Sequence, residues 1–223
     1  VYMTMLEWLK GLPKAKKALP LLSFPSVALT GESVHTVTHD AIKQAEGVKA
    51  IADALPLAAA VTMMDLSLEA EAFGATLDET EGEVPTVLGE VIFAEEDGLE
   101  GAEALRVPSV GEGRTALYIE AATLAKSCVN DRPTLAGIIG PYSLAGRLMG
   151  VTEALMNCLC EEEFTHTVLR KTTDFLKAYA LAYKQAGLDG IVMAEPLAGI
   201  MSPDMAEEFS VPYVKRIIEA VQD

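Results

Sequence analysis

The sequence has few cysteines, and the three it has, Cys128, Cys158 and Cys160, are too few for a disulfide framework. Scarce cysteine in an acidic chain fits a reducing compartment. Cys158 and Cys160 form a C-x-C pair within an expected helix, where residues two apart point in different directions and chelate a metal poorly. We therefore expect ordinary helix packing for this pair and a cytoplasmic location for the protein.

Basic residues are also scarce, because 17 Lys and Arg stand against 33 Asp and Glu, which gives a formal net charge of -16. Such a surface repels polyanions and excludes nucleic acid as a broad-surface partner. Long apolar runs are absent too. No stretch approaches the roughly 20 apolar residues that cross a bilayer, and the amino terminus lacks the pattern of a signal peptide. We expect no membrane partner.

The chain has 223 residues, and 50% of them are hydrophobic. Its shorter apolar runs alternate with segments of helical periodicity. Four runs read as strands, at residues 19–30, 58–64, 134–140 and 190–194. Strands that alternate with helices predict an α/β fold with a parallel sheet, in one domain over residues 1–223. Four such units are half of a (β/α)8 TIM barrel, which needs about 250 residues. An open doubly wound sheet is the alternative, but the ending VKRIIEAVQD favours a barrel that continues past Asp223.

The stretch from Thr134 to Gly150, TLAGIIGPYSLAGRLMG, holds a buried strand, a turn and a helix start. Its first part is almost entirely apolar, which suits a parallel strand covered on both faces. The following Gly-Pro ends the strand, and Ser143 is expected to cap the helix. Tyr142, Ser143 and Arg147 therefore reach the rim where the carboxyl ends of parallel strands gather ligands.

Two carboxylates also follow predicted strands, Asp65 after AAAVTMM and Glu195 after GIVMA. Asp65 is expected either to cap the next helix or to act as a ligand group at the mouth of the barrel. Glu69 and Glu71 lie two apart on that helix, so at most one of them faces the mouth.

Other polar residues and segments are expected to have structural roles and not to bind ligands. His35 and His39 lie four apart, but HTVTH lacks the glutamate of a zincin helix and its β-branched residues disfavour a helix, so solvent-facing loop histidines are expected. The acidic region 74–108 is expected to be a lid or solvated connection with a short helix near its end. His166, on a long helix predicted over 163–185, is expected at the surface.

Three segments carry a family resemblance: MDLSLEAEAFG at 64–74, DRPTLAGIIGPYSLAGRLMG at 131–150, and IVMAEPLAGIMSP at 191–203. They resemble the uroporphyrinogen decarboxylase superfamily, and within it the branch of cobamide-dependent methyltransferases. The resemblance implies a (β/α)8 TIM barrel with Asp65, the GPYSLAG turn and Glu195 at its mouth.

The decarboxylase branch fits less well. Its members place an aspartate against the tetrapyrrole at the position of Asp65 and hold substrate carboxylates with arginines just after the first strand. This chain has SFPSVALTG there, and no arginine occurs before Arg106. A tyrosine of that branch is replaced by Arg147. A substrate with many carboxylates would meet an acidic, arginine-poor mouth.

The methyltransferase branch implies a methyl-corrinoid donor carried by a corrinoid protein, and a zinc ion that presents a small thiol as thiolate. Its zinc ligands, a His-x-Cys pair and a later Cys, would lie beyond Asp223, so no metal ligand is assigned in this chain. The small-molecule methyl acceptor would meet the predicted pocket residues, which are Asp65, Tyr142, Ser143, Arg147 and Glu195.

Arg147 is expected to pair with an anionic tail of the acceptor, or alternatively to form a salt bridge with Asp65 or Glu195. Two other functions stay open. One is uroporphyrinogen decarboxylation, and the other is a non-catalytic partner that docks a corrinoid protein or forms a homodimer.

Overall fold

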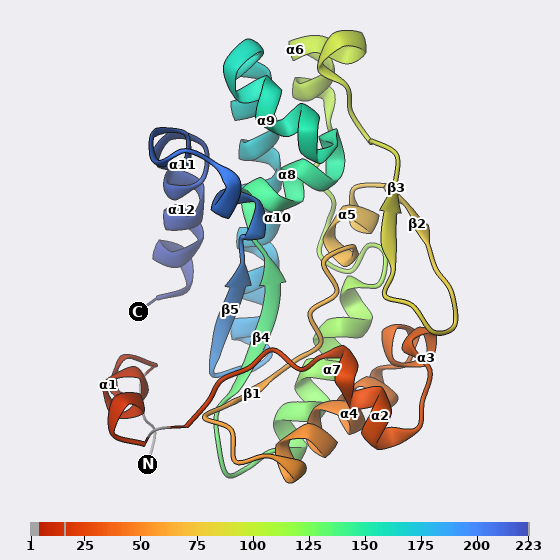
Figure 1. The fold of residues 1–223 in the computed structure, drawn as a ribbon, viewed down its shortest axis with the longest axis vertical. Helices are drawn as coiled ribbons and strands as arrows, with labels where there is room; N and C mark the ends of the chain where they lie inside the picture. The colour runs from red at the N-terminus through yellow and green to blue at the C-terminus, as the bar shows by residue number, and fades with distance from the viewer. Residues whose placement is uncertain (1–4, 16, 223) are drawn as a thin grey trace.

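The computed structural model describes residues 5–15 and 17–222, and its centre is a three-stranded parallel sheet (Figure 1). The strand order is β1-β4-β5, with β1 at Ala60–Val61, β4 at Thr134–Ile139 and β5 at Gly190–Ala194. β4 pairs with both neighbours, and all 6 of its residues are buried. This burial confirms the parallel α/β sheet that the apolar run predicted.

Helices lie behind the sheet in the view of Figure 1, where α7 and α10 run past β4. The longest helix, α10, packs against β4, α6, α8 and α12, while α4 packs against α7 and β1. The long helix predicted over 163–185 is confirmed as α10. The described helices include α1 Met5–Ala15, α4 Ala41–Ala54, α5 Leu68–Ala72, α7 Thr115–Cys128, α8 Pro141–Met149, α9 Val151–Cys160, α10 Glu162–Gln185, α11 Pro203–Phe209 and α12 Val211–Val221.

The predicted first strand over residues 19–30 is wrong. The segment forms the 3-10 helix η1 (Phe24–Ser26) and the short helix α2 (Val27–Thr30), which ends at Gly31 in the left-handed conformation. Pro25 starts the helical turn and cannot donate to a strand ladder. Three parallel strands are therefore present among the described residues, instead of the expected four.

The acidic region between residues 74 and 108 has more structure than a solvated connection. It forms an antiparallel hairpin of β2 (Thr76–Asp78) and β3 (Thr86–Leu88), followed by α6 (Ala94–Ala104). Figure 1 places this hairpin beside α5, along one side of the molecule. The predicted short helix near its end is part of α6.

The prediction of loop histidines was half right. His35 and His39 are exposed, but they lie in a helix, α3 (Val34–His39), which Ser33 caps by accepting a hydrogen bond from the N–H of Thr36. The cap supplies the stabilisation that the β-branched residues do not. The two rings stack with centroids 4.2 Å apart, so they do not form a chelating pair.

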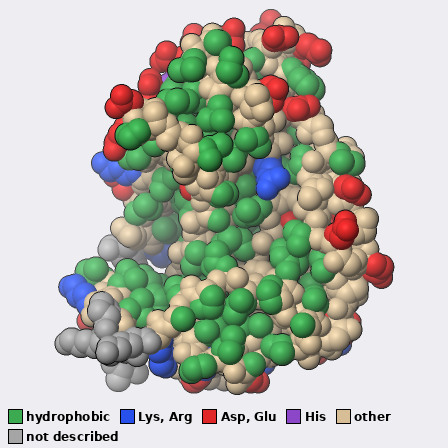
Figure 2. Space-filling model, viewed as in Figure 1, with side chains coloured by type: hydrophobic (Ala, Val, Ile, Leu, Met, Phe, Trp, Pro, Cys, Tyr) green, Lys and Arg blue, Asp and Glu red, His purple; other side chains and the backbone are tan. Residues whose placement is uncertain are grey.

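Strand β5 is an edge strand. Among residues 5–15 and 17–222 its one partner strand is β4, and all 5 of its residues are partly exposed, in contrast to the buried β4. The face seen in Figure 2 has hydrophobic side chains over its middle and lower parts and acidic side chains mainly at the margins. Strand β5 therefore forms an apolar, partly exposed edge of the sheet in the part of the chain that the structure describes. Within the described residues, no helix is long and apolar enough to cross a membrane.

Candidate functional site

The carboxyl ends of the three parallel strands meet at one edge, as the sequence predicted. Ile139 of β4 is opposite Ala194 of β5, and the N–H of Gly140 donates to the Ala194 carbonyl at 2.7 Å. The helix after β1 reaches the same edge, because Glu69 Oε1 accepts the N–H of Ile139 at 3.0 Å. The structure therefore brings Asp65, the GPYS turn and Glu195 to one end of the sheet.

Asp65 lies at this edge with a fully buried side chain whose two oxygens are both bonded. Oδ1 accepts the backbone N–H of Ser67 at 3.0 Å and its hydroxyl at 2.6 Å. Oδ2 accepts Arg114 Nη1 at 3.0 Å and the Tyr118 hydroxyl at 3.2 Å. Asp65 thus fixes the turn before α5 and the start of α7, and neither oxygen is left for a further donor.

Arg114 is the residue that sequence reasoning missed. Its side chain is 8% exposed and ion-pairs with Asp65, with Glu71 at 2.8 Å and with Glu79 at 3.8 Å. The expected salt bridge from Arg147 to Asp65 is therefore wrong, because Arg114 holds that carboxylate. The only local signal was an arginine just before an apolar helix, and its partners are far away in sequence.

Glu69 settles which acid of α5 points inward. Its side chain is buried beneath the end of β4, while Glu71 turns toward Arg114. Burial raises the pKa of Glu69 to about 8, partly offset by the hydrogen bond from the Ile139 N–H. Glu69 Oε2 is buried without a hydrogen-bond partner. We therefore expect the side chain to be mostly protonated at neutral pH.

Glu195 closes the turn after β4 from the side of β5. Its Oε1 accepts the N–H of Ser143 at 2.5 Å, while Oε2 is buried without a partner against Gly140. Burial raises the pKa of the Glu195 carboxyl above its ordinary value. The expected salt bridge from Arg147 to Glu195 is not formed either, since the carboxylate bonds to backbone instead.

Ser143 and Tyr142 occupy positions different from those predicted. Ser143 does not cap α8, because the capping position is Gly140 and the helix starts at Pro141. The Ser143 hydroxyl instead accepts the N–H of Leu197 at 3.1 Å, which joins α8 to the 3-10 helix η2 (Pro196–Ile200). Tyr142 is fully buried, and its hydroxyl lies 3.5 Å from Cys158 Sγ. Both side chains support the rim from inside.

Arg147 is the predicted site residue whose side chain remains available to bind a ligand. It lies on α8, four residues after Ser143 and so on the same helix face, and it is partly exposed. No hydrogen bond or ion pair joins its guanidinium to another residue in 5–15 or 17–222. The guanidinium can therefore take an anionic ligand without breaking a contact within this part of the chain.

The contact between Glu195 and Gly140 gives a testable prediction. A Cβ added at Gly140 would lie 1.7 Å from Glu195 Oε2, so Gly140→Ala must push the carboxylate off the Ser143 N–H. We expect a loss of about 1–3 kcal/mol in the free energy of unfolding, measured by urea denaturation.

The matched control for that prediction is Gly199→Ala on η2, where an added Cβ meets nothing within 4 Å. This variant should stay within about 0.5 kcal/mol of the wild type. Equal stability of the two variants would show that the position of the Glu195 carboxylate does not depend on Gly140.

Comparison with known proteins identifies the family and the fold of the chain. Residues 25–223 match the family described as "Uroporphyrinogen decarboxylase (URO-D)". A solved structure described as a "methyltransferase from Methanosarcina mazei" superposes with a TM-score of 0.81 at 22% identity, over 100% of this chain and 68% of that chain. The superposition confirms the predicted barrel-type α/β fold, of which this chain forms a part.

Curated relatives carry two different names. "Methylcobamide:CoM methyltransferase MtbA" of Methanosarcina acetivorans is 30% identical over 163 residues, which are 71% of this chain and 47% of that protein. "Uroporphyrinogen decarboxylase" of Christiangramia forsetii is 30% identical over 134 residues, 57% of this chain and 39% of that protein. The chain spans about half the length of the curated relatives it matches. The extent of the family match shows that this chain belongs to the uroporphyrinogen decarboxylase family.

Proposed function

We propose that the protein to which this chain belongs transfers a methyl group from a methylated corrinoid to a small acceptor. The observation that carries the proposal is the contrast between Asp65, whose oxygens are all bonded within the protein, and Arg147, which has no partner among the described residues. The similarity to proteins named methylcobamide:CoM methyltransferase supports it. The methyl donor, its carrier protein and the acceptor are parts of this proposal.

The same contrast weighs against the decarboxylase alternative. The resemblance implies that a decarboxylase uses the aspartate at the position of Asp65 to contact its tetrapyrrole. Here that side chain is 0% exposed and ion-paired to Arg114, so contact with a substrate would require breaking a buried ion pair. The match to decarboxylases keeps this activity as an outcome to be tested.

Within the proposal, Arg147 binds an anionic group of the acceptor, such as a sulfonate or carboxylate. Glu195 holds the turn that presents α8, and Asp65, Tyr142 and Ser143 shape the rim from beneath. We further propose that residues 1–223 are the amino-terminal part of one barrel domain. The partly exposed edge of β5 supports this arrangement.

The zinc implied by the resemblance needs thiolate ligands, and the described residues do not fit it. Cys158 is buried, where its thiol donates to the Ala154 carbonyl at 3.2 Å and contacts Tyr142, and Cys160 is exposed on the other side of the same helix. A zinc of that kind would need ligands from outside this chain.

The direct test uses the full-length protein with methylcobalamin and a thiol, and follows the loss of methylcobalamin absorbance. Turnover would support the methyltransferase. Release of carbon dioxide from uroporphyrinogen would support the decarboxylase instead. Tight binding of a corrinoid protein with neither reaction would support a non-catalytic partner and overturn the proposal.

Arg147→Met gives a sharper test of the acceptor site. We expect the KM for mercaptoethanesulfonate to rise about tenfold to a hundredfold, because a hydrogen bond to a charged group contributes about 1.5–3 kcal/mol. The KM for the uncharged mercaptoethanol should not change. Arg216→Met, which removes an exposed arginine paired with Asp174 on α10, is the control and should leave both values unaltered. Equal effects on the two thiols would remove the assignment of Arg147.

A further inference from the structure

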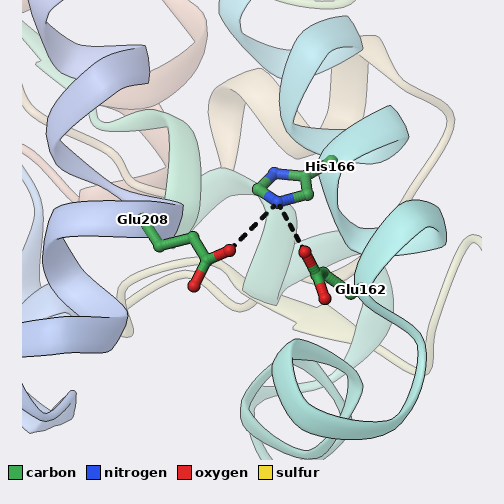
Figure 3. Close-up of side chains that lie close together, drawn as sticks. All are labelled: Glu162, His166 and Glu208. Atoms are coloured by element: carbon green, nitrogen blue, oxygen red, sulfur yellow. Dashed lines mark ion pairs between the residues drawn. The ribbon is translucent and has the colours of Figure 1, made fainter.

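A histidine and two glutamates converge at the start of α10, outside the strand-end site. Glu162 and His166 come from the first turns of α10, and Glu208 comes from α11 (Figure 3). His166 Nε2 lies 3.8 Å from Glu162 Oε1 and 3.8 Å from Glu208 Oε1. One ligand atom from each residue lies within 4.8 Å of the others. Two separate helices thus direct an imidazole and two carboxylates at one point.

The imidazole is held in this orientation by groups outside the cluster. His166 Nδ1 lies 2.7 Å from the Tyr213 hydroxyl, and the ring stacks on Phe209 with centroids 4.6 Å apart and planes at 15°. Phe209 and Tyr213 are themselves buried, at 2% and 8% exposure. The ring direction is therefore fixed by packing and does not depend on the two flexible glutamates.

The direction of the hydrogen bond between His166 Nδ1 and the Tyr213 hydroxyl depends on the tautomer of the imidazole. The Tyr213 hydroxyl has a single proton, and it reaches the His166 carbonyl oxygen at 3.5 Å. When the hydroxyl donates there, Nδ1–H donates to the Tyr213 oxygen and Nε2 keeps a lone pair. This is the arrangement of metal-ligating histidines, whose second ring nitrogen donates to a neighbouring group.

In that tautomer the Nε2 lone pair and the two carboxylates are directed at one point, where a cation would take the place of the Nε2 proton of the other tautomer. The separation of 3.8 Å is beyond a hydrogen bond and slightly wider than the roughly 3.3–3.5 Å between ligand atoms of tetrahedral zinc with bonds of about 2.0–2.1 Å. The Glu162 and Glu208 side chains are 65% and 52% exposed, so they can move inward without breaking a packed contact.

We propose that Glu162, His166 and Glu208 bind a divalent transition-metal ion of the zinc class, with water completing the coordination. One nitrogen and two carboxylate oxygens form a donor set that suits this class of ion. The ion would join α10 to α11 and so brace the segment that follows Glu195 and η2. The inference does not rest on the proposed methyl transfer.

The experiment counts bound zinc in the purified full-length protein after it has been stripped with a chelator. The wild type is expected to bind one equivalent of Zn²⁺ more than His166→Ala, and Co²⁺ in its place should give a visible absorption band that His166→Ala lacks. His39→Ala is the matched control, because His39 Nε2 also lies near one carboxylate, at 3.4 Å from Glu79. It should bind as much as the wild type. Comparing variants cancels any zinc bound elsewhere.

A second variant keeps the proposal falsifiable if His166→Ala disturbs folding. Glu208→Gln preserves shape and the histidine but removes one ligand charge, so Zn²⁺ affinity should fall at least about tenfold. Added Zn²⁺ should raise the Tm of the wild type and leave that of Glu208→Gln nearly unchanged. Equal zinc content in the wild type and His166→Ala, or a full Tm shift in Glu208→Gln, would overturn the site.

Discussion

Replacing Arg114 by methionine is expected to destabilise the protein by about 3–5 kcal/mol, which is the usual cost of leaving a buried charge without its partner. The Asp65 side chain is 0% exposed, and Arg114 is its counter-ion at 3.0 Å. Methionine keeps much of the length of the arginine but none of its donors, so Asp65 and Glu71 lose their cationic partner. Urea denaturation followed by circular dichroism measures the free energy of unfolding.

Two controls separate the buried charge from general effects of losing an arginine. Arg106→Met removes an arginine whose partner, Glu112, is bound at the surface, with side chains 67% and 35% exposed, and should change stability far less. The double variant Arg114→Met/Asp65→Asn should recover part of the loss, because the uncompensated carboxylate is gone. If Arg106→Met and Arg114→Met cost the same, the network around Asp65 is not a buried one.

The Arg114 network also shows which parts of the site cannot be predicted from the sequence. β4 and β5 were predictable because a parallel strand covered by helices must be a run of apolar residues, and TLAGII and GIVMA are such runs. The placement of Glu195 followed from GIVMA, and the placement of Asp65 followed from the apolar run AAAVTMM that precedes it. The pairing of Asp65 with Arg114 crosses 49 residues and depends on how α5 and α7 pack, which no local pattern encodes.

The strand predicted over residues 19–30, before β1, was wrong for a related reason. LPLLSFPSVALT is as apolar as a strand, yet Pro25 starts a helical turn and Gly31 ends α2. The segment still packs beside the chain that follows β1, because the hydroxyl of Ser23 accepts the N–H of Met64 at 2.9 Å. Apolar content predicted burial near the sheet, while the choice between strand and helix depended on one proline and one glycine.

Glu69→Gln is expected to remove a large pH dependence of stability. In the unfolded chain Glu69 ionises near pH 4.5, whereas burial raises its pKa in the folded protein to about 8. Between these values the unfolded state binds fewer protons than the folded state, so a rise in pH lowers the free energy of unfolding by about 1.4 kcal/mol per unit. Below pH 4.5 both states are protonated and above pH 8 both are ionised, so the slope vanishes outside this window.

Glutamine does not titrate, so the stability of the wild type relative to Glu69→Gln should fall by about 2.5 kcal/mol from pH 5.5 to 7.5. Below pH 4.5 the two should be alike, because a neutral carboxyl and an amide have similar shapes and both can accept the Ile139 N–H. Urea denaturation at several pH values gives the difference curve. Glu120→Gln, at an exposed position on α7, tests whether removing any one negative charge produces the same slope.

Parallel stability curves for the wild type and Glu69→Gln would mean that Glu69 is ionised in the folded protein. An ionised Glu69 would require a cation or a water network at Oε2, where the described residues provide no hydrogen-bond partner. The expected slope instead makes Glu69 a neutral acid beneath the end of β4, which keeps a second negative charge away from Asp65. The rim can then carry the buried Asp65–Arg114 pair and leave the guanidinium of Arg147 for a ligand.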